Sequence, residues 1–226
     1  MSIIQISPIK VLLLSRFPIV LYGLQQLLES KESTLEIVGS ATNREDAIAA
    51  LKRQIPDVVL IEIETQAGLE LVGELLAALP GRVLVVTATN DDALIDAAVA
   101  AGASGIIRKT EPVDVYHKAL ERVGLGELWL DRATTGRVFQ RMARKKPEQE
   151  KTSEQARIEN LTRKERLIAA EIGRDASATS QQIAERLHIS DSTLRNHLTS
   201  VYAKLDLGNR LELYAFANRH GIKGSI

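Results

Sequence analysis

The chain has 226 residues, of which 45% are hydrophobic and 26% charged, and it contains no cysteine. This length is sufficient for two ordinary globular domains, and the missing cysteines exclude disulfides, thiol nucleophiles and thiolate metal sites. The four histidines follow no zinc-binding spacing, and no apolar run approaches the roughly 20 residues that span a bilayer. We therefore expect a cytoplasmic protein without a metal, a cofactor or a membrane partner.

The formal net charge is zero, but the charges are unevenly distributed. Residues 1–140 carry 13 basic and 18 acidic side chains, whereas residues 141–226 carry 16 basic and 11 acidic ones. An excess of basic residues in the second part is a weak indication of nucleic-acid contact, because a charged stretch is more often simply a solvated surface.

Short apolar runs alternate with amphipathic stretches from Ile9 to about Gly124. The runs lie at residues 9–14, 35–41, 57–63, 82–88 and 104–109, and the helix-like stretches at 18–30, 44–54, 69–79, 91–101 and 113–123. The runs are rich in Val, Ile and Leu without polar alternation, which is typical of parallel strands covered on both faces. This order predicts an α/β domain with a doubly wound, five-stranded parallel sheet.

Polar side chains follow the apolar runs where ligands of such sheets gather, at the carboxyl ends of the strands. These side chains are Ser15, Arg16, Glu62, Thr87 and Lys109. Glu62 is the most informative, because it directly follows the buried run in "PDVVLIEIETQAGLE". Its carboxylate is either the centre of a site or simply a solvated residue at a strand end.

The stretch 141–160 is hydrophilic, carries dense charge of both signs, and predicts a linker that is helical in part. We accordingly divide the chain into a first domain at residues 1–125, a linker region at 126–158 and an all-α domain at 159–226.

Helix-capping signals recur in the last domain. Thr162 with Glu165, and Thr179 with Gln182, form two capping boxes that open successive helices. Ser190 can cap a third helix, "DSTLRNHLTSVYAKL", and "LELYAFANRH" forms a fourth.

The third of these helices has two different faces. Its apolar stripe consists of Leu194, Leu198, Val201 and Leu205, and its polar face of Ser192, Arg195, Asn196 and Thr199. Such polar side chains read base edges in the major groove, while Lys204 and Arg210 suit phosphates. A short helix, a tight turn and this helix predict a helix-turn-helix, although the periodicity also fits an ordinary surface helix.

The segment from "LTRKERLIAAEI" through "SQQIAERLHISDSTLRNHLTSVYAKLDLGNRLEL" resembles the LuxR-type helix-turn-helix of NarL/FixJ-family response regulators. The resemblance extends over almost the whole chain, and it implies a flavodoxin-like receiver with strand order 2-1-3-4-5 followed by a DNA-binding domain. The polar face of the third helix and the positions matched by the resemblance together give the predicted DNA-binding residues, which are Ser192, Thr193, Arg195, Asn196, Thr199, Lys204 and Arg210.

The first domain resembles a receiver through "VVTA" and "GASGIIRK". Receivers use an aspartate to accept a phosphoryl group, two acidic residues to hold Mg²⁺, and a Thr or Ser and a Lys to stabilise phosphoryl oxygens. Thr87 and Lys109 match, but Ser15 and Arg16 replace the acidic pair and Glu62 replaces the aspartate. Mg²⁺ prefers carboxylate ligands, and the extra methylene of Glu62 displaces its oxygens by roughly 1 Å.

We therefore expect a degenerate receiver in which Glu62 is a fixed charge, with Lys109 or Arg16 as its counterion. The expected function is transcriptional regulation independent of aspartyl phosphorylation, without enzymatic activity. Two alternatives are a phosphorylation-responsive regulator with a displaced acceptor, and an adaptor whose helix-turn-helix no longer binds DNA.

The expected partners are double-stranded DNA and a second copy of the chain, with RNA polymerase as a candidate and no productive sensor kinase. The last helix would supply a dimer contact, although the same face could instead pack within its own domain. Its residues on that face are Leu211, Tyr214, Ala215 and Asn218.

Overall fold

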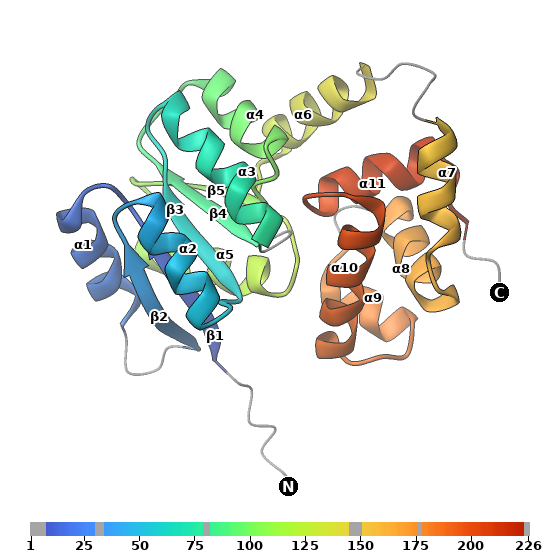
Figure 1. Cartoon of the computed structure of the whole chain (residues 1–226), viewed down its shortest axis with the longest axis horizontal. Helices are drawn as coiled ribbons and strands as arrows, with labels where there is room; N and C mark the ends of the chain where they lie inside the picture. Colours follow the sequence, from blue (N-terminus) through green and yellow to red (C-terminus); the bar gives the residue numbers. More distant parts are fainter. Residues whose placement is uncertain (1–7, 30–33, 79–81, 145–150, 176–177, 224–226) are drawn as a thin grey trace, which may run out of the picture.

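The computed structural model describes residues 8–29, 34–78, 82–144, 151–175 and 178–223. Figure 1 shows a sheet domain and, beside it, a domain made only of helices. No helix within the described ranges is long and apolar enough to cross a membrane.

Five parallel strands form one sheet in the order β2-β1-β3-β4-β5, which confirms the predicted fold. The strands are β1 (Ile9–Leu14), β2 (Leu35–Ala41), β3 (Val58–Glu62), β4 (Val83–Thr87) and β5 (Gly105–Arg108). Every residue of β4 is buried, as expected for a central run without polar alternation. The edge strand β2 is only partly buried, so the expectation that every run is covered on both faces is wrong for this strand.

Helices cover both faces of the sheet because alternate strand residues point in opposite directions. Val11 and Leu13 of β1 pack toward α1 and α5, whereas Leu12 and Leu14 pack toward α2, α3 and α4. These helices are α1 (Pro18–Leu28), α2 (Arg44–Arg53), α3 (Leu69–Ala78), α4 (Asp92–Ala100) and α5 (Val113–Gly124). A short 3₁₀ turn, η1 (Gln66–Gly68), connects β3 to α3. The carboxyl ends of the parallel strands meet at one edge of the sheet.

Much of the predicted linker is helical. Helix α6 (Arg132–Arg144) packs against α4, and Arg137 forms ion pairs with Asp92 and Asp96 at 3.2 and 3.0 Å. Helix α7 (Lys151–Glu159) packs against the last domain through the buried Ile158. The expected boundary at residue 159 coincides with the last residue of α7.

The helical domain consists of α7 and four further helices. These are α8 (Arg163–Arg174), α9 (Ser180–Arg186), α10 (Asp191–Leu205) and α11 (Arg210–Arg219). Ile168, Ile183, Leu198 and Phe216 share its core, so the predicted apolar stripe of α10 is buried in its own domain. Both predicted capping boxes are present, and Ser190 caps α10 by accepting from the Thr193 N–H.

Glu165 of the first capping box also forms an ion pair with Lys204. The Glu165 carboxylate accepts from the Thr162 N–H and from Lys204 Nζ, both at 2.7 Å, and from Ser200 Oγ at 2.6 Å. Burial raises the pKa of this carboxyl, but the bonds from Lys204, Ser200 and Thr162 outweigh it and lower the pKa to about 2. Glu165 thus joins α8 to α10.

Replacing Glu165 with Ala is expected to lower the free energy of unfolding by about 2 to 4 kcal/mol, because it removes half of a capping box and a buried ionic partner. Since the folded pKa lies below the ordinary 4.5, the carboxylate's contribution is complete above about pH 4.5 and is lost toward pH 2. Urea unfolding across this pH range measures both effects. The matched control is Gln182→Ala in the neutral capping box, with an expected loss of about 1 kcal/mol and no such pH dependence. Equal losses in the two variants would contradict the prediction.

Candidate acceptor site and nucleic-acid interface

The polar side chains expected at the carboxyl ends of the strands converge on Glu62. Its carboxylate accepts from Ser15 Oγ and from Lys109 Nζ, one bond on each oxygen, and its side chain is only 4% exposed. Lys109 is held in place because its backbone N–H donates to the Thr87 carbonyl at 2.9 Å. Glu62 is therefore a paired, buried carboxylate rather than a solvated one.

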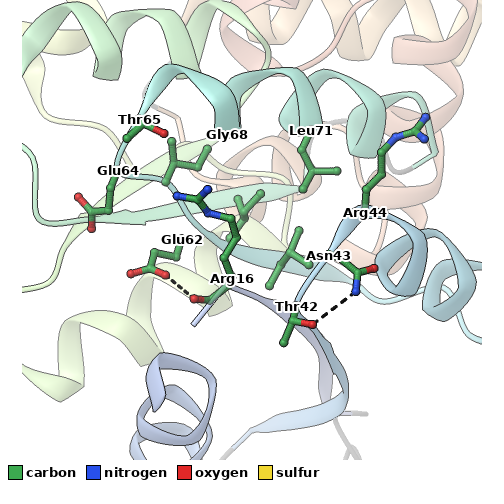
Figure 2. Close-up of a pocket in the computed structure, with 13 residues that line it drawn as sticks. Arg16, Thr42, Asn43, Arg44, Glu62, Glu64, Thr65, Gly68 and Leu71 are labelled. Atoms are coloured by element: carbon green, nitrogen blue, oxygen red, sulfur yellow. Dashed lines mark hydrogen bonds between the residues drawn. The ribbon is translucent and has the colours of Figure 1, made fainter. Parts of the chain in front are cut away.

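Arg16 is not the counterion of Glu62. Its side chain is exposed, and its guanidinium lies 5.8 Å from the centroid of the Phe17 ring. Figure 2 shows this side chain crossing a pocket toward the loop that carries Thr65 and Gly68. The pocket has a volume of about 270 Å³ and is lined by the ends of β1 and β3 and the start of α2. Of the two counterions that the sequence left open, the structure selects Lys109.

Glu64 is a site residue that the sequence analysis missed. Its carboxylate accepts from the Ala88 N–H at 2.9 Å and from Thr87 Oγ1 at 3.3 Å, and it lies 2.8 Å from Lys109 Nζ. Side chains two residues apart on an extended chain point the same way, so the spacing of the acids in "EIET" is the signal that could have revealed it. Lys109 consequently bridges two carboxylates.

These contacts shift the pKa values of Glu64 and Lys109. Burial lowers the pKa of the Lys109 ammonium, but its bonds to Glu62 and Glu64 outweigh this and raise the pKa above 10.5. Burial raises the pKa of the Glu64 carboxyl, but the bonds from Lys109, Ala88 and Thr87 outweigh it and lower the pKa below 4.5. Glu64 and Lys109 are thus both charged at neutral pH.

The predicted base-reading face of α10 is partly covered by the sheet domain. Arg195 Nη1 lies 3.4 Å from Asp57 Oδ1, and Arg82 Nη2 donates to Thr199 Oγ1 at 3.2 Å. Asp57 and Arg82 are themselves 3.7 Å apart, and they precede β3 and β4, at the end of the sheet opposite Glu62. Figure 1 shows α10 on the side of its domain that faces the sheet domain.

The other residues predicted to bind DNA have different surroundings. Ser192 and Asn196 are exposed, whereas Thr193 is half-buried, with its hydroxyl 2.8 Å from that of Ser190. Lys204 is paired with Glu165 at 2.7 Å. In this arrangement the exposed part of the predicted face is therefore its amino-terminal end.

Arg210 does not present a phosphate-binding surface in this structure. It is 1% exposed and donates through Nη2 to the Ala178 carbonyl at 2.6 Å, and burial lowers the pKa of its guanidinium. Its Nε and Nη1 are buried without a hydrogen-bond partner in the described part of the chain. The expected exposed phosphate contact is thus corrected to a buried structural position at the start of α11.

The predicted dimer face of α11 packs within the chain. Leu211 is buried against Val99 of α4 and Val138 of α6, and Ala215 is also buried. Tyr214 packs against the core of the helical domain, and Asn218 donates to the Gly173 carbonyl at 2.9 Å. Most of this face therefore packs within its own domain, in agreement with the alternative to a dimer contact. Leu211 also contacts the sheet domain and α6.

A polar contact adds to this interdomain surface. The buried Glu127 carboxylate accepts from the Ser180 N–H at 2.5 Å, and Ser180 Oγ donates to the Leu125 carbonyl at 2.8 Å. The start of α9 is therefore fixed to the segment that follows α5.

Comparison with known proteins identifies both domains. Residues 11–121 match the response regulator receiver domain, and residues 159–217 match the luxR family of bacterial regulatory proteins. The chain is 31% identical over 222 residues to the transcriptional regulatory protein LnrK of Bacillus subtilis (strain 168), covering 95% of this chain and 98% of that protein. It is 28% identical over 220 residues to the nitrate/nitrite response regulator protein NarL of Escherichia coli (strain K12), with coverage of 96% and 98%.

A solved structure of the two-component response regulator RcsB–DNA complex shares the fold, with a TM-score of 0.50, 21% identity and coverage of 92% of this chain and 97% of that one. The 31% identical relative and the two domain matches lead to one assignment. The chain belongs to the response regulators that join a receiver domain to a luxR-type DNA-binding domain, a family of transcriptional regulators.

Proposed function

We propose that this protein is a cytoplasmic transcriptional regulator that binds double-stranded DNA as a homodimer and whose receiver works without aspartyl phosphorylation. The observation that carries this proposal is the state of Glu62, which replaces the acceptor aspartate. Both of its carboxylate oxygens are already bonded, one to Ser15 and the other to Lys109. These contacts hold Glu62 as a fixed, paired charge, and its extra methylene displaces the oxygens by roughly 1 Å from where an aspartate would present them to a phosphoryl group.

The residues present do not fit the Mg²⁺ ion that receivers use. Mg²⁺ requires near-octahedral oxygen coordination and usually takes carboxylates. The positions after β1 are occupied by Ser15, whose hydroxyl is bonded to Glu62, and by Arg16, whose guanidinium repels a cation. We therefore derive no chemical step through a metal at this site.

Incubation of the full-length protein with acetyl phosphate or phosphoramidate and Mg²⁺ is expected to leave its intact mass unchanged. The matched control is the triple variant Ser15→Asp, Arg16→Asp and Glu62→Asp, which restores the acidic pair and the acceptor. Mass spectrometry should detect one added phosphoryl group on this variant. The same addition to the unmodified protein would instead favour a phosphorylation-responsive regulator.

The contacts of α10 support a closed state in which the receiver restrains the DNA-binding domain. Arg195 and Thr199 cannot contact a base edge while they are bonded to Asp57 and Arg82. Binding then requires the domains to separate, and the apparent affinity falls with the fraction of open molecules. We place regulation at the separation of α10 from Asp57 and Arg82, rather than at phosphorylation of Glu62.

An adaptor that no longer binds DNA is distinguished by the salt dependence of binding to a random duplex. A domain that contacts about four phosphates should lose roughly a hundredfold in affinity between 50 and 200 mM salt. Fluorescence anisotropy on a labelled duplex measures this loss. Undetectable binding at low salt, by both the full-length protein and residues 151–226, would favour the adaptor.

A further inference from the structure

Three hydrogen-bond donors from β4, β5 and the residues that follow them converge on the Glu64 carboxylate. They are Thr87 Oγ1 at 3.3 Å, the Ala88 N–H at 2.9 Å and Lys109 Nζ at 2.8 Å. A hydroxyl, a main-chain amide and an ammonium supply only hydrogens toward this point, so the place where they meet suits an oxyanion.

The sheet fixes these donors independently of Glu64. Thr87 is 1% exposed and pairs with Arg108 across β4 and β5, and the Lys109 N–H donates to the Thr87 carbonyl at 2.9 Å. Glu64, in contrast, reaches the donors from the connection between β3 and η1. The sheet thus sets the backbone positions from which the donors project, Glu62 also holds the Lys109 ammonium, and the Glu64 carboxylate reaches them from a loop.

A phosphorylated aspartate would both occupy the acceptor position and present negative charge to the phosphoryl-stabilising residues. In this protein Glu62 has the first function and Glu64 the second. Glu62 stands at the end of β3 in place of the acceptor, whereas Glu64 places a negative charge on Thr87 and Lys109, the two residues matched to the family's phosphoryl-stabilising positions. Glu64 also bonds the backbone beyond β4 through the Ala88 N–H, which Glu62 does not contact in the structure. The loop after β3 is thereby tied to the loop after β4.

We propose that Glu64 is an intramolecular ligand of an oxyanion site formed by Thr87, Ala88 and Lys109, and that it holds the β3–α3 and β4–α4 loops together. This inference rests on the proposed phosphorylation-independent receiver and names the group that takes the place of the phosphoryl ligand. Once its own carboxylate is removed, the site takes small oxyanions such as formate or inorganic phosphate.

Glu64→Ala in the full-length protein tests the proposal by chemical rescue. The variant should unfold about 4 °C below the unmodified protein. Sodium formate should raise its melting temperature saturably, whereas the unmodified protein should show only the general salt effect measured with sodium chloride. The matched control is Glu70→Ala, an exposed glutamate at the start of α3, which should show no formate-specific shift.

A second readout applies if the alanine variant unfolds too readily. Glu64→Gln keeps the size of the side chain, and the backbone amide resonance of Ala88 should shift relative to the unmodified protein. Adding inorganic phosphate should then shift it further, saturably. Absence of a saturable anion effect in both variants, or an equal effect in Glu70→Ala, would overturn the proposal. The mass measurement on the unmodified protein is independent, so failure of the proposed function is distinguishable from failure of this inference.

Discussion

Asp57→Asn is expected to raise the affinity of the full-length protein for DNA by roughly tenfold to thirtyfold, equivalent to about 1.4 to 2 kcal/mol. Asp57 lies between two guanidinium groups, 3.4 Å from Arg195 and 3.7 Å from Arg82. Burial lowers the pKa of Arg82, Asp57 opposes this effect and Arg195 adds to it. Without the carboxylate, the closed state holds two neighbouring cations with no counterion between them. The open state relieves this repulsion because each guanidinium is then hydrated.

The substitution is conservative for the receiver itself. Asp57 Oδ2 accepts from the Lys10 N–H at 3.0 Å, and the amide oxygen of Asn can accept the same bond. Asp114→Asn is the matched control, since it makes the same charge change at an exposed pair with Lys118 on α5. Affinities are compared by anisotropy at one fixed salt concentration, because phosphate contacts depend strongly on salt. Unchanged affinity for Asp57→Asn would mean that the contact with Arg195 does not restrain α10 in solution.

Local pattern accounts for the parts of the structure that were predicted well. The apolar runs of the sheet lack polar alternation because both faces are covered, and the helix starts are marked by side chains that satisfy unpaired N–H groups within three residues. Thr162 and Glu165 therefore identify the start of α8 without any knowledge of the fold. The polar ends of the strands were also predictable, since parallel strands place their carboxyl ends at one edge.

The partners that the sequence does not predict lie on segments far away in the chain. Arg195 and Asp57 are 138 residues apart, and neither has a local pattern that points to the other. The role of Glu64 depends on how the loop after β3 turns toward Ala88, which the sequence of that loop does not specify. The charge of Arg210 predicts a place at the surface, but the side chain is buried and donates to the Ala178 carbonyl, 32 residues away in the chain. Charge and polarity predicted which residues matter, whereas tertiary packing decides which partners they have.

Arg195→Ala, made in the Asp57→Asn background, is expected to weaken binding to the preferred DNA sequence by about 1 to 3 kcal/mol, or roughly fivefold to 150-fold. The background is needed because Arg195 also contacts Asp57, so its loss from the closed protein would release α10 and remove a DNA contact at the same time. In the closed state the Arg195 Nε is buried without a hydrogen-bond partner among the described residues, and base or phosphate acceptors could satisfy it once the domain is open.

The pattern of the loss across sequences decides the role of Arg195. If it reads a base, affinity for a random duplex should change little, and the preference at one position of fragments selected by the protein should relax. An equal loss on every duplex would instead identify a phosphate contact, with a shallower dependence on salt. Arg174→Ala is the matched control, because it removes an exposed charge from the end of α8, outside the predicted reading face, and leaves α10 unaltered. Arg174→Ala is expected to leave the base preference unchanged. A base preference that relaxes in Arg195→Ala alone would therefore assign base reading to Arg195.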